Sequence, residues 1–225
     1  MKIIENKKVF AFDAKNECVA EVVDGETVLF RTHDCFDNQL SEEGTCIGAL
    51  NWDRINPATG PVYVENAKAG DVLKVEILEI TLDKQGVMCA LPENGVLGSL
   101  VKEESVKRIK VEEGKVHFND KLVFDVTPMI GVIGVAPENG SINCGTPGCH
   151  GGNMDNKRIK EGASLYFPVF HDGALFSLGD VHAAMGDGEI MVSGVEISAD
   201  VKVRLSVIKG ISIETPMLEN EELCG

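Results

Sequence analysis

The sharpest chemical signal in this sequence is the pair Asp180 and His182, separated by one residue. Residues two apart on an extended chain face the same side, so both side chains can converge on one metal ion or one proton. The turn Gly186-Asp187-Gly188-Glu189 then returns further carboxylates to the same neighbourhood. Asp187 fits an ordinary acidic turn, whereas Glu189 begins a strand-like segment and is the predicted catalytic carboxylate.

Two other histidines stand beside polar residues in segments that favour turns. The pair His33-Asp34 lies where a predicted strand ends, and a histidine there is more often a surface or hydrogen-bonded residue than a ligand. His150 precedes two glycines, which bring the backbone round the imidazole and leave room for a ligand. Asn153 and Asp155 follow, and they fit either a helix cap or a polar contact in the same site.

Several common catalytic templates are excluded by residue spacing. The sequence has no phosphate-binding loop of the Walker type, no dinucleotide-binding glycine motif and no His-Glu-x-x-His helix. Ser177 lacks the glycine two residues earlier that a nucleophile elbow requires, which disfavours a serine hydrolase. A cysteine nucleophile at Cys144 or Cys149 stays open, although Cys149 would need a general base, and His150 points away from it on an extended backbone.

The elements that must position these residues are predominantly strands. Apolar and polar residues alternate in the segments 73–77, 116–118 and 201–207, which indicates half-buried strands. Turn dipeptides such as Asp24-Gly25 and Glu113-Gly114 fall between them. The sequence therefore predicts a mainly β protein with an antiparallel, sandwich- or barrel-like architecture, with short helical turns expected only within Glu93–Lys102 and Asn153–Lys160.

One long segment interrupts the strand pattern. Residues 137–153 are rich in Gly, Pro, Asn and Ser, and they predict a long loop of the kind that often carries function. No composition change divides the chain into independent halves. We therefore expect residues 1–225 to form a single catalytic unit.

Charge and composition restrict the partners of this chain. It has 225 residues with 21 Lys+Arg against 36 Asp+Glu, a net charge of −15, which argues against nucleic acid and anionic lipid as partners. The longest apolar run is far shorter than a membrane span, and the N-terminus lacks the apolar region of a signal peptide. Seven scattered cysteines are expected to be reduced thiols, and the predicted location is the cytoplasm.

A set of motifs, in order along most of the chain, carries a family resemblance. The motifs are Thr32-His33-Asp34, NPATGPVYVENA at 56–67 running into 70–77, the apolar run 130–137, HGGNMD at 150–155 and PVFHDGALFSLGDVHAAMGDGE at 168–189. The last motif combined with the GGNMD loop is highly specific. Together they resemble the acetamidase/formamidase family.

The resemblance implies a mainly β hydrolase of small aliphatic amides such as formamide and acetamide, releasing ammonia and a carboxylate. It also implies a metal ion at the site and a homodimer. The matched polar positions are His33, Asp34, His150, Asn153, Asp155, Asp180, His182 and Glu189. This chain is shorter than many members, and Met185 stands where the family often has glutamine, so its amide preference stays open.

A metal-assisted mechanism follows from these residue types. Imidazole and carboxylate ligands would hold a zinc-like ion with an open position and lower the pKa of its water to roughly 7. The expected ligands are His33, Asp34, His150, Asp180 and His182. They exceed what one four-coordinate ion needs, so either a second ion such as Ca²⁺ binds or some orient the others. Asn153 and Asp155 are expected to contact substrate or ligands, and Glu189 to act as the base.

Two alternatives belong to other classes. A non-catalytic metal- or carbohydrate-binding β-sandwich would need only the ligands, because a fold of this kind does not by itself imply catalysis. A cysteine amidase using Cys149 or Cys144 would be sensitive to thiol alkylation but not to chelators.

Overall fold

The computed structural model describes residues 1–221, which form strands and three single turns of 3-10 helix. The strands of the N-terminal half are β1 (Lys2–Ile4), β2 (Lys8–Val9), β3 (Ala11–Asp13), β4 (Ala20–Val22), β5 (Thr27–Thr32), β6 (Ala58–Val64), β7 (Val72–Ala90) and β8 (Ser105–Glu112). The remaining strands are β9 (Lys115–His117), β10 (Val123–Asp125), β11 (Met129–Gly134), β12 (Ser141–Asn143), β13 (Gly151–Asn153), β14 (Ser164–Pro168), β15 (Phe176–His182), β16 (Glu196–Ile208) and β17 (Met217–Glu219). The 3-10 turns are η1 (Ile47–Ala49), η2 (Trp52–Arg54) and η3 (Gly98–Leu100).

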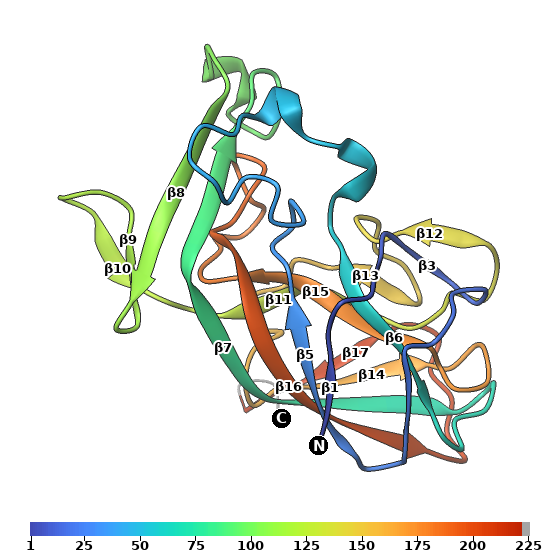
Figure 1. Cartoon of the computed structure of the whole chain (residues 1–225). Helices are drawn as coiled ribbons and strands as arrows, with labels where there is room; N and C mark the ends of the chain where they lie inside the picture. The colour runs from blue at the N-terminus through green and yellow to red at the C-terminus, as the bar shows by residue number, and fades with distance from the viewer. Residues whose placement is uncertain (222–225) are drawn as a thin grey trace.

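The two longest strands, β7 and β16, run antiparallel and organise the molecule. Val201 pairs with Ile80, and the alternating apolar residues of both strands are buried. Register shifts next to Ala199 and next to Val203 mark bulges, which bend a strand. Figure 1 shows both strands turning a corner midway, so each takes part in two portions of the sheet.

Fifteen strands belong to one sheet, whose main path runs β10-β9-β8-β7-β16-β15-β11-β13. Strands β5, β6 and β14 branch from this path by pairing with β16, β15 and β7. Almost all pairs are antiparallel, and the exceptions among the described residues are β1 beside β5 and β4 beside β6. Strands β3 and β12 form a separate two-stranded sheet.

Strand β15 lies at the centre of this arrangement. It pairs with β16, β11 and β6, and every one of its residues is buried. A strand paired and covered in this way holds its polar side chains inside the protein. The C-terminal end of β15 therefore fixes Asp180 and His182 in the interior, where their partners must come from neighbouring segments.

The described residues form one large apolar core and two small apolar clusters. The main core includes Phe30, Phe167 and Phe176, with Phe30 and Phe176 in an edge-to-face contact at 5.6 Å between ring centroids. A small apolar cluster lies apart from it, formed by Cys35, Phe36, Leu40, Ile47, Leu50, Val87 and Cys89, with Ile55, Leu91, Val106 and Val192 packed against it.

The mainly β, antiparallel prediction is confirmed, and the helix predictions are only partly right. The segment Glu93–Lys102 contains one 3-10 turn, η3. The helix expected within Asn153–Lys160 is wrong: Asn153 ends strand β13, where it pairs with Val132, and turns follow. A positive φ of 40° at Asp155 is incompatible with a helix there. The predicted loop 137–153 also contains β12 and β13.

The described part of the chain contains no helix that is long and apolar enough to cross a membrane. Its cysteines are free thiols, namely Cys18, Cys35, Cys46, Cys89, Cys144 and Cys149. Cys224, the remaining cysteine of the sequence, lies outside the described residues.

Candidate active site

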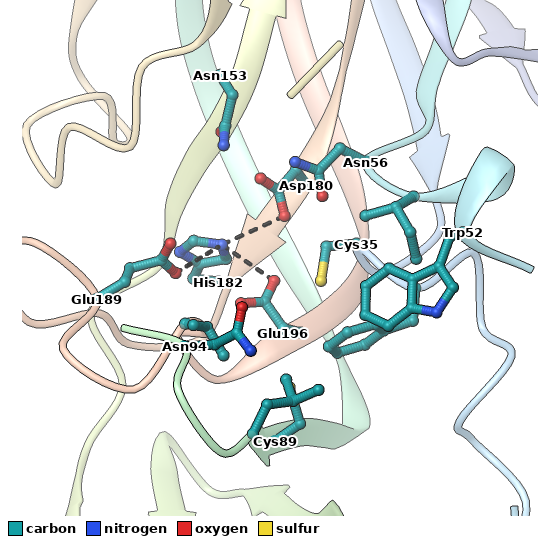
Figure 2. A pocket seen from close by; sticks show the side chains of 14 residues that line it. Cys35, Trp52, Asn56, Cys89, Asn94, Asn153, Asp180, His182, Glu189 and Glu196 are labelled. Carbon is teal, nitrogen blue, oxygen red and sulfur yellow. Dashed lines mark hydrogen bonds and ion pairs between the residues drawn. The ribbon is translucent and has the colours of Figure 1, made fainter. Parts of the chain in front are cut away.

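A buried group of acidic side chains surrounds His182, and we call Asp155, Asp180, His182, Glu189 and Glu196 the His182 cluster. Nε2 of His182 lies 3.0 Å from Oε2 of Glu196, 3.3 Å from Oδ1 of Asp180 and 3.8 Å from Oε1 of Glu189. The side chains of His182, Asp180 and Glu196 are at most 3% exposed, and that of Glu189 is 20% exposed. Figure 2 shows these four side chains converging on one point.

The pairing of strands explains why these residues meet. His182 on β15 is the direct antiparallel neighbour of Glu196 on β16, and such cross-strand neighbours bring their side chains together. Asp180 has a φ of 53°, a conformation that is unfavourable for a residue with a side chain and that concentrates at functional sites. Glu189 comes from the loop between the two strands, and Asp155 follows β13.

Strand β11 leaves space for two of the carboxylates because it has a glycine beside them. A Cβ atom on Gly131 would lie 2.6 Å from Oδ1 of Asp155 and 2.6 Å from Oδ2 of Asp180. Any larger residue at this position would displace one of the two carboxylates. The close approach of this backbone is therefore part of the construction of the cluster.

The ligand atoms in the cluster have the types and spacing of a metal site. Asp155, His182 and Glu189 form one candidate group, and Asp180, Glu196 and Cys35 form another, with the ligand atoms of each group within 4.8 Å of one another. Oε2 of Glu196 is paired with Nε2 of His182 at 3.0 Å, but Oδ1 of Asp155 and Oε1 of Glu189 are buried without a hydrogen-bond partner among the described residues. Carboxylate oxygens left in this state fit a divalent cation, since they otherwise stay uncompensated.

Three carboxyl groups of the cluster have raised pKa values, because they are buried and lie close to other negative charges. Burial, together with the charge of Asp180, raises the pKa of Asp155 to about 7 and also raises the pKa of Glu189. Burial raises the pKa of Glu196 to about 8, with the attraction of His182 opposing the shift. For His182, burial lowers the pKa, but the charges of Glu196 and Asp180 outweigh burial and hold it well above 6.5.

The cluster opens into a cavity of about 350 Å³ with two different walls. One wall is polar and carries Asp180, His182, Glu189, Glu196, Asn56, Asn94 and Asn153. The rest of the lining is mainly apolar and consists of Phe36, Trp52, Ile55, Cys89, Leu91 and Val192, whereas Cys35 lies beside Asp180 and Glu196. Figure 2 shows Trp52 on the opposite side of the cavity from Glu189. This division resembles ligand pockets in general, which are mostly apolar with a few orienting polar groups.

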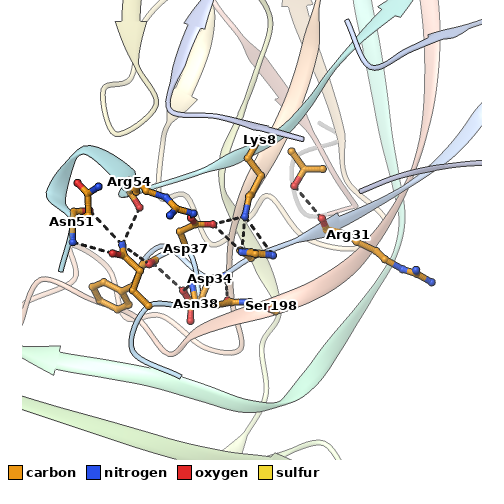
Figure 3. A network of polar contacts seen from close by, with 12 residues as sticks. Lys8, Arg31, Asp34, Asp37, Asn38, Asn51, Arg54 and Ser198 are labelled. Carbon is orange, nitrogen blue, oxygen red and sulfur yellow. Dashed lines mark hydrogen bonds and ion pairs between the residues drawn. The ribbon is translucent and has the colours of Figure 1, made fainter. Parts of the chain in front are cut away.

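The pair His33-Asp34 lies next to this cavity rather than in it. His33 is part of a separate network in which Nδ1 lies 2.8 Å from Oδ1 of Asp37. Asp34 accepts hydrogen bonds from the backbone N–H groups of Phe36 and Asn38, and burial raises its pKa to about 6. Figure 3 shows Asp34 within the turn that follows β5. Asp34 thus holds the shape of the chain beside the site.

His150 is buried but lies at a different cavity, which it shares with Cys149, Phe170 and other residues. Its ring packs edge-on against Phe12 at 5.1 Å between centroids, and burial lowers its pKa. Asn153, three residues later, does line the cavity of the His182 cluster. Met185 borders another cavity. The structure therefore brings together Asp180, His182, Glu189, Asn153 and Asp155, whereas His33, Asp34 and His150 neither line this cavity nor belong to either candidate ligand group.

The thiols singled out from the sequence also lie away from the cluster. Cys144 is buried in a small cluster with Phe12, and burial raises its pKa to about 12. Cys149 is exposed beside His150. Cys35 is the thiol next to the carboxylates, and burial, with Glu196 adding to it, raises its pKa well above 9. A thiol with a raised pKa is a poor nucleophile, because attack requires the thiolate.

Sequence reasoning missed Glu196 and Cys35. The position of Glu196 depends on the register of β16 against β15, which the sequence pattern does not reveal. The alternation along β16 gave no signal for Glu196, because this residue is in phase with the polar residues Ser198 and Asp200 of the same strand. Cys35 enters the site because the turn after β5 packs against the loop that carries Asn56, whose backbone N–H donates to the carbonyl of Cys35 at 2.7 Å.

Comparisons with solved structures and sequences agree with this architecture. The chain is 49% identical to a predicted acetamidase/formamidase from Thermoanaerobacter tengcongensis, with a TM-score of 0.95 covering 98% of this chain and 73% of that one. It is 45% identical to an acetamidase from Bacillus halodurans, with a TM-score of 0.94 covering 98% of this chain and 75% of that one.

A more distant relative is a putative formamidase of Schizosaccharomyces pombe, 25% identical over 265 residues that cover 88% of this chain. The chain spans 64% of the length of that relative. The family model described as the Acetamidase/Formamidase family matches residues 11–143 and 141–224. The match extends over nearly the whole sequence and includes every residue of the His182 cluster, so this chain belongs to the acetamidase/formamidase family.

Proposed function

We propose that this protein is a metal-dependent amidohydrolase that hydrolyses linear amides at the His182 cluster. The reaction is RCONH₂ + H₂O → RCOO⁻ + NH₄⁺. The observation that carries the proposal is the surplus of carboxylates around one buried imidazole, two of them with a buried oxygen that has no hydrogen-bond partner among the described residues, beside a cavity large enough for a small molecule. The acetamidases and formamidases among the similar proteins support the same class of substrate.

The donor set fits a divalent ion, and we propose His182, Asp180, Glu196 and Asp155 as its ligands. Zinc accepts imidazole and carboxylate ligands, and a harder ion such as calcium accepts the remaining carboxylate oxygens. When bound, such an ion polarises the amide carbonyl and makes water more acidic. His33, Asp34 and His150 lie outside the cavity, and we assign them no ligand role.

Glu189 is the proposed general base and acid. It is more accessible than Asp180 and Glu196, it lies on a loop, and its Oε1 accepts no hydrogen bond from any described residue. Burial raises its pKa, which makes this carboxyl group a better proton acceptor than an exposed glutamate. Glu189 takes the proton of the attacking water and delivers it to the nitrogen that leaves as ammonia.

The asparagine side chains of the polar wall orient the amide. Asn56, Asn94 and Asn153 line the cavity, and Oδ1 of Asn153 is buried without a hydrogen-bond partner among the described residues. A carboxamide oxygen of this kind accepts from the NH₂ group of the substrate, while an asparagine NH₂ donates to the carbonyl oxygen. Fixing both ends of the amide holds its carbonyl carbon in front of the attacking water.

The whole chain, residues 1–225, is proposed to work as one catalytic unit within a homodimer. The free thiols among the described residues support a reducing compartment, and we propose the cytoplasm. Light scattering tests the dimer, because the mass of a single 24.2 kDa chain in solution would contradict it.

The experiment that tests the proposed function combines elemental analysis with an ammonia assay on formamide and acetamide. We expect a bound divalent metal, ammonia release, loss of release on chelation and recovery when zinc is returned. Release of ammonia that persists without metal but stops on thiol alkylation would favour a cysteine amidase instead. Bound metal with no ammonia from any amide would identify a binding protein.

A further inference from the structure

The apolar wall of the cavity has no role in the chemistry of the amide group itself. Phe36, Ile55, Leu91 and Val192 all belong to the small apolar cluster, and their side chains face the same cavity as Asp180 and Glu196. Phe36 is 5% exposed, and the other three are half-buried at the cavity surface. A wall of this composition gains free energy only when apolar groups of a ligand cover it.

The cavity also has more room than the smallest amides fill. Acetamide has four heavy atoms and occupies roughly the space of four water molecules, each about 30 Å³ in the liquid. The cavity measures about 350 Å³, which lies at the lower end of the range of pockets for drug-sized ligands. Acetamide would leave most of the apolar wall in contact with water.

The positions of the polar and the apolar side chains determine how an amide is oriented in the cavity. The nitrogen must leave as ammonia beside Glu189 and the other carboxylates, where its positive charge after protonation is stabilised. The acyl group on the other side of the carbonyl then points to the wall with Phe36 and Trp52. The carboxylates around His182 disfavour an anionic acyl group, since like charges in close juxtaposition repel.

We infer that the preferred substrate is a neutral primary amide whose acyl group is apolar and larger than acetyl, of about the size of phenylacetyl. This inference rests on the proposed amidohydrolase function and specifies its substrate class. Trp52 is the residue that most directly determines this preference. It lies on η2 at the mouth of the cavity and is 58% exposed, so an apolar acyl group is needed to cover its ring.

The test compares kcat/KM for acetamide, phenylacetamide and acetanilide. Phenylacetamide and acetanilide are isomers that differ in whether the ring is attached to the acyl side or to the nitrogen. One methylene in an apolar pocket is worth about tenfold or more in kcat/KM, so we expect phenylacetamide to exceed acetamide by about 10- to 100-fold. Acetanilide should be hydrolysed more slowly than acetamide, because its ring would face the carboxylates.

Variants of Trp52 connect this preference to the apolar wall. Trp52→Ala should lower the ratio of kcat/KM for phenylacetamide to that for acetamide by about tenfold, and Trp52→Phe should recover most of that ratio. The control is Ile211→Ala, which removes an apolar side chain of similar exposure (51%) that lines none of the described cavities. We expect the ratio in this control to equal that of the wild type.

Two results would overturn the inference while leaving the proposed function intact. One is a kcat/KM for acetamide that equals or exceeds that for phenylacetamide, and the other is faster hydrolysis of acetanilide than of phenylacetamide. An unchanged ratio in Trp52→Ala would remove the assignment to Trp52. If none of the three amides releases its amine or ammonia from metal-loaded protein, the proposed function itself fails, and the substrate class fails with it.

Discussion

Asp37, in the turn after β5, and Glu196, at the start of β16, are both buried carboxylates, but the charges around them are arranged in opposite ways. Lys8 lies 2.5 Å from Oδ1 of Asp37, Arg54 pairs with Oδ2, and His33 lies 2.8 Å away. Figure 3 shows Asp37 between Lys8 and Arg54. Burial raises the pKa of Asp37, but the hydrogen bond and charge of Lys8, then Arg54 and His33, outweigh it and lower the pKa.

Around Glu196 the balance is reversed. The four carboxylates of the His182 cluster share one imidazole as their cationic partner inside the cluster, and the pKa values of Asp155, Glu189 and Glu196 are all raised. Such an arrangement costs stability, because one imidazole cannot offset the desolvation of four buried or half-buried carboxylates. Charge balance thus distinguishes a structural network from a site that is completed by a ligand.

Replacing the histidine of each region by alanine should give the largest difference in bound metal and ammonia release. His182→Ala removes the single imidazole of the cluster, so we expect bound metal and ammonia release to fall together to background. His33→Ala removes a partly exposed ring from the balanced network, so metal content and turnover should stay within about twofold of the wild type. Elemental analysis and the ammonia assay check both variants. Full metal occupancy in His182→Ala would contradict the assigned ligands.

Glu189→Gln separates catalysis from metal binding inside the His182 cluster. Glutamine keeps the shape of the side chain but accepts no proton, so turnover should fall by about 10²- to 10⁴-fold while the metal stays bound. Glu103→Gln makes the same chemical change at an exposed position and serves as the control. Loss of metal in parallel with turnover would make Glu189 a ligand and remove it from the role of base.

Asp37→Asn tests the balanced region. Removing this carboxylate weakens its charge-assisted hydrogen bonds with Lys8 and Arg54, each of a kind worth about 1.5–3 kcal/mol, so unfolding in urea should show a loss of about that size. Metal content should not change. In metal-free protein, Glu196→Gln should not destabilise the fold, because it removes a carboxylate whose charge is already unfavourable there. Equal losses of stability in both variants would contradict the conclusion that Asp37 is charge-balanced and Glu196 is not.

The pH dependence of the metal-free protein should have opposite signs in the two regions. The folded pKa of Glu196 is raised to about 8 and that of Asp155 to about 7, so between about pH 4.5 and 8 the folded state binds more protons than the unfolded state. Stability from these groups therefore falls as the pH rises through that window. The lowered pKa of Asp37 contributes stability above about pH 3.8 that is lost as the pH falls further.

Thermal unfolding in the presence of a chelator at pH 5, 6.5 and 8 measures this effect. We expect Tm to fall by a few degrees across the series, since each kcal/mol lowers Tm by about 2–4 °C in a chain of this size. In Glu196→Gln, the fall in Tm between pH 5 and pH 8 should be smaller than in the wild type. A Tm that rises steadily from pH 5 to pH 8 would contradict the raised pKa values of the cluster.

Local sequence patterns determined much of the fold. Alternation along 73–77 and 201–207 correctly located parts of β7 and β16, because a half-buried strand requires an apolar residue at every second position. Glu113-Gly114 closes the β8–β9 hairpin with positive φ at both residues. The expected helix within 153–160 failed because pairing with β11 makes Asn153 the end of a strand, a contact between residues far apart in sequence.

For the site, the sequence by itself determined that Asp180 and His182 lie side by side and that an acidic turn follows them, since both features depend on local spacing. It did not determine that Glu196 lies beside His182, because a shift of one residue in the register of β16 would turn that side chain to the opposite face. Nor did it determine that His150 lies at another cavity. Only the tertiary structure decided which polar residues share one interior, because burial and strand register depend on pairing between distant segments.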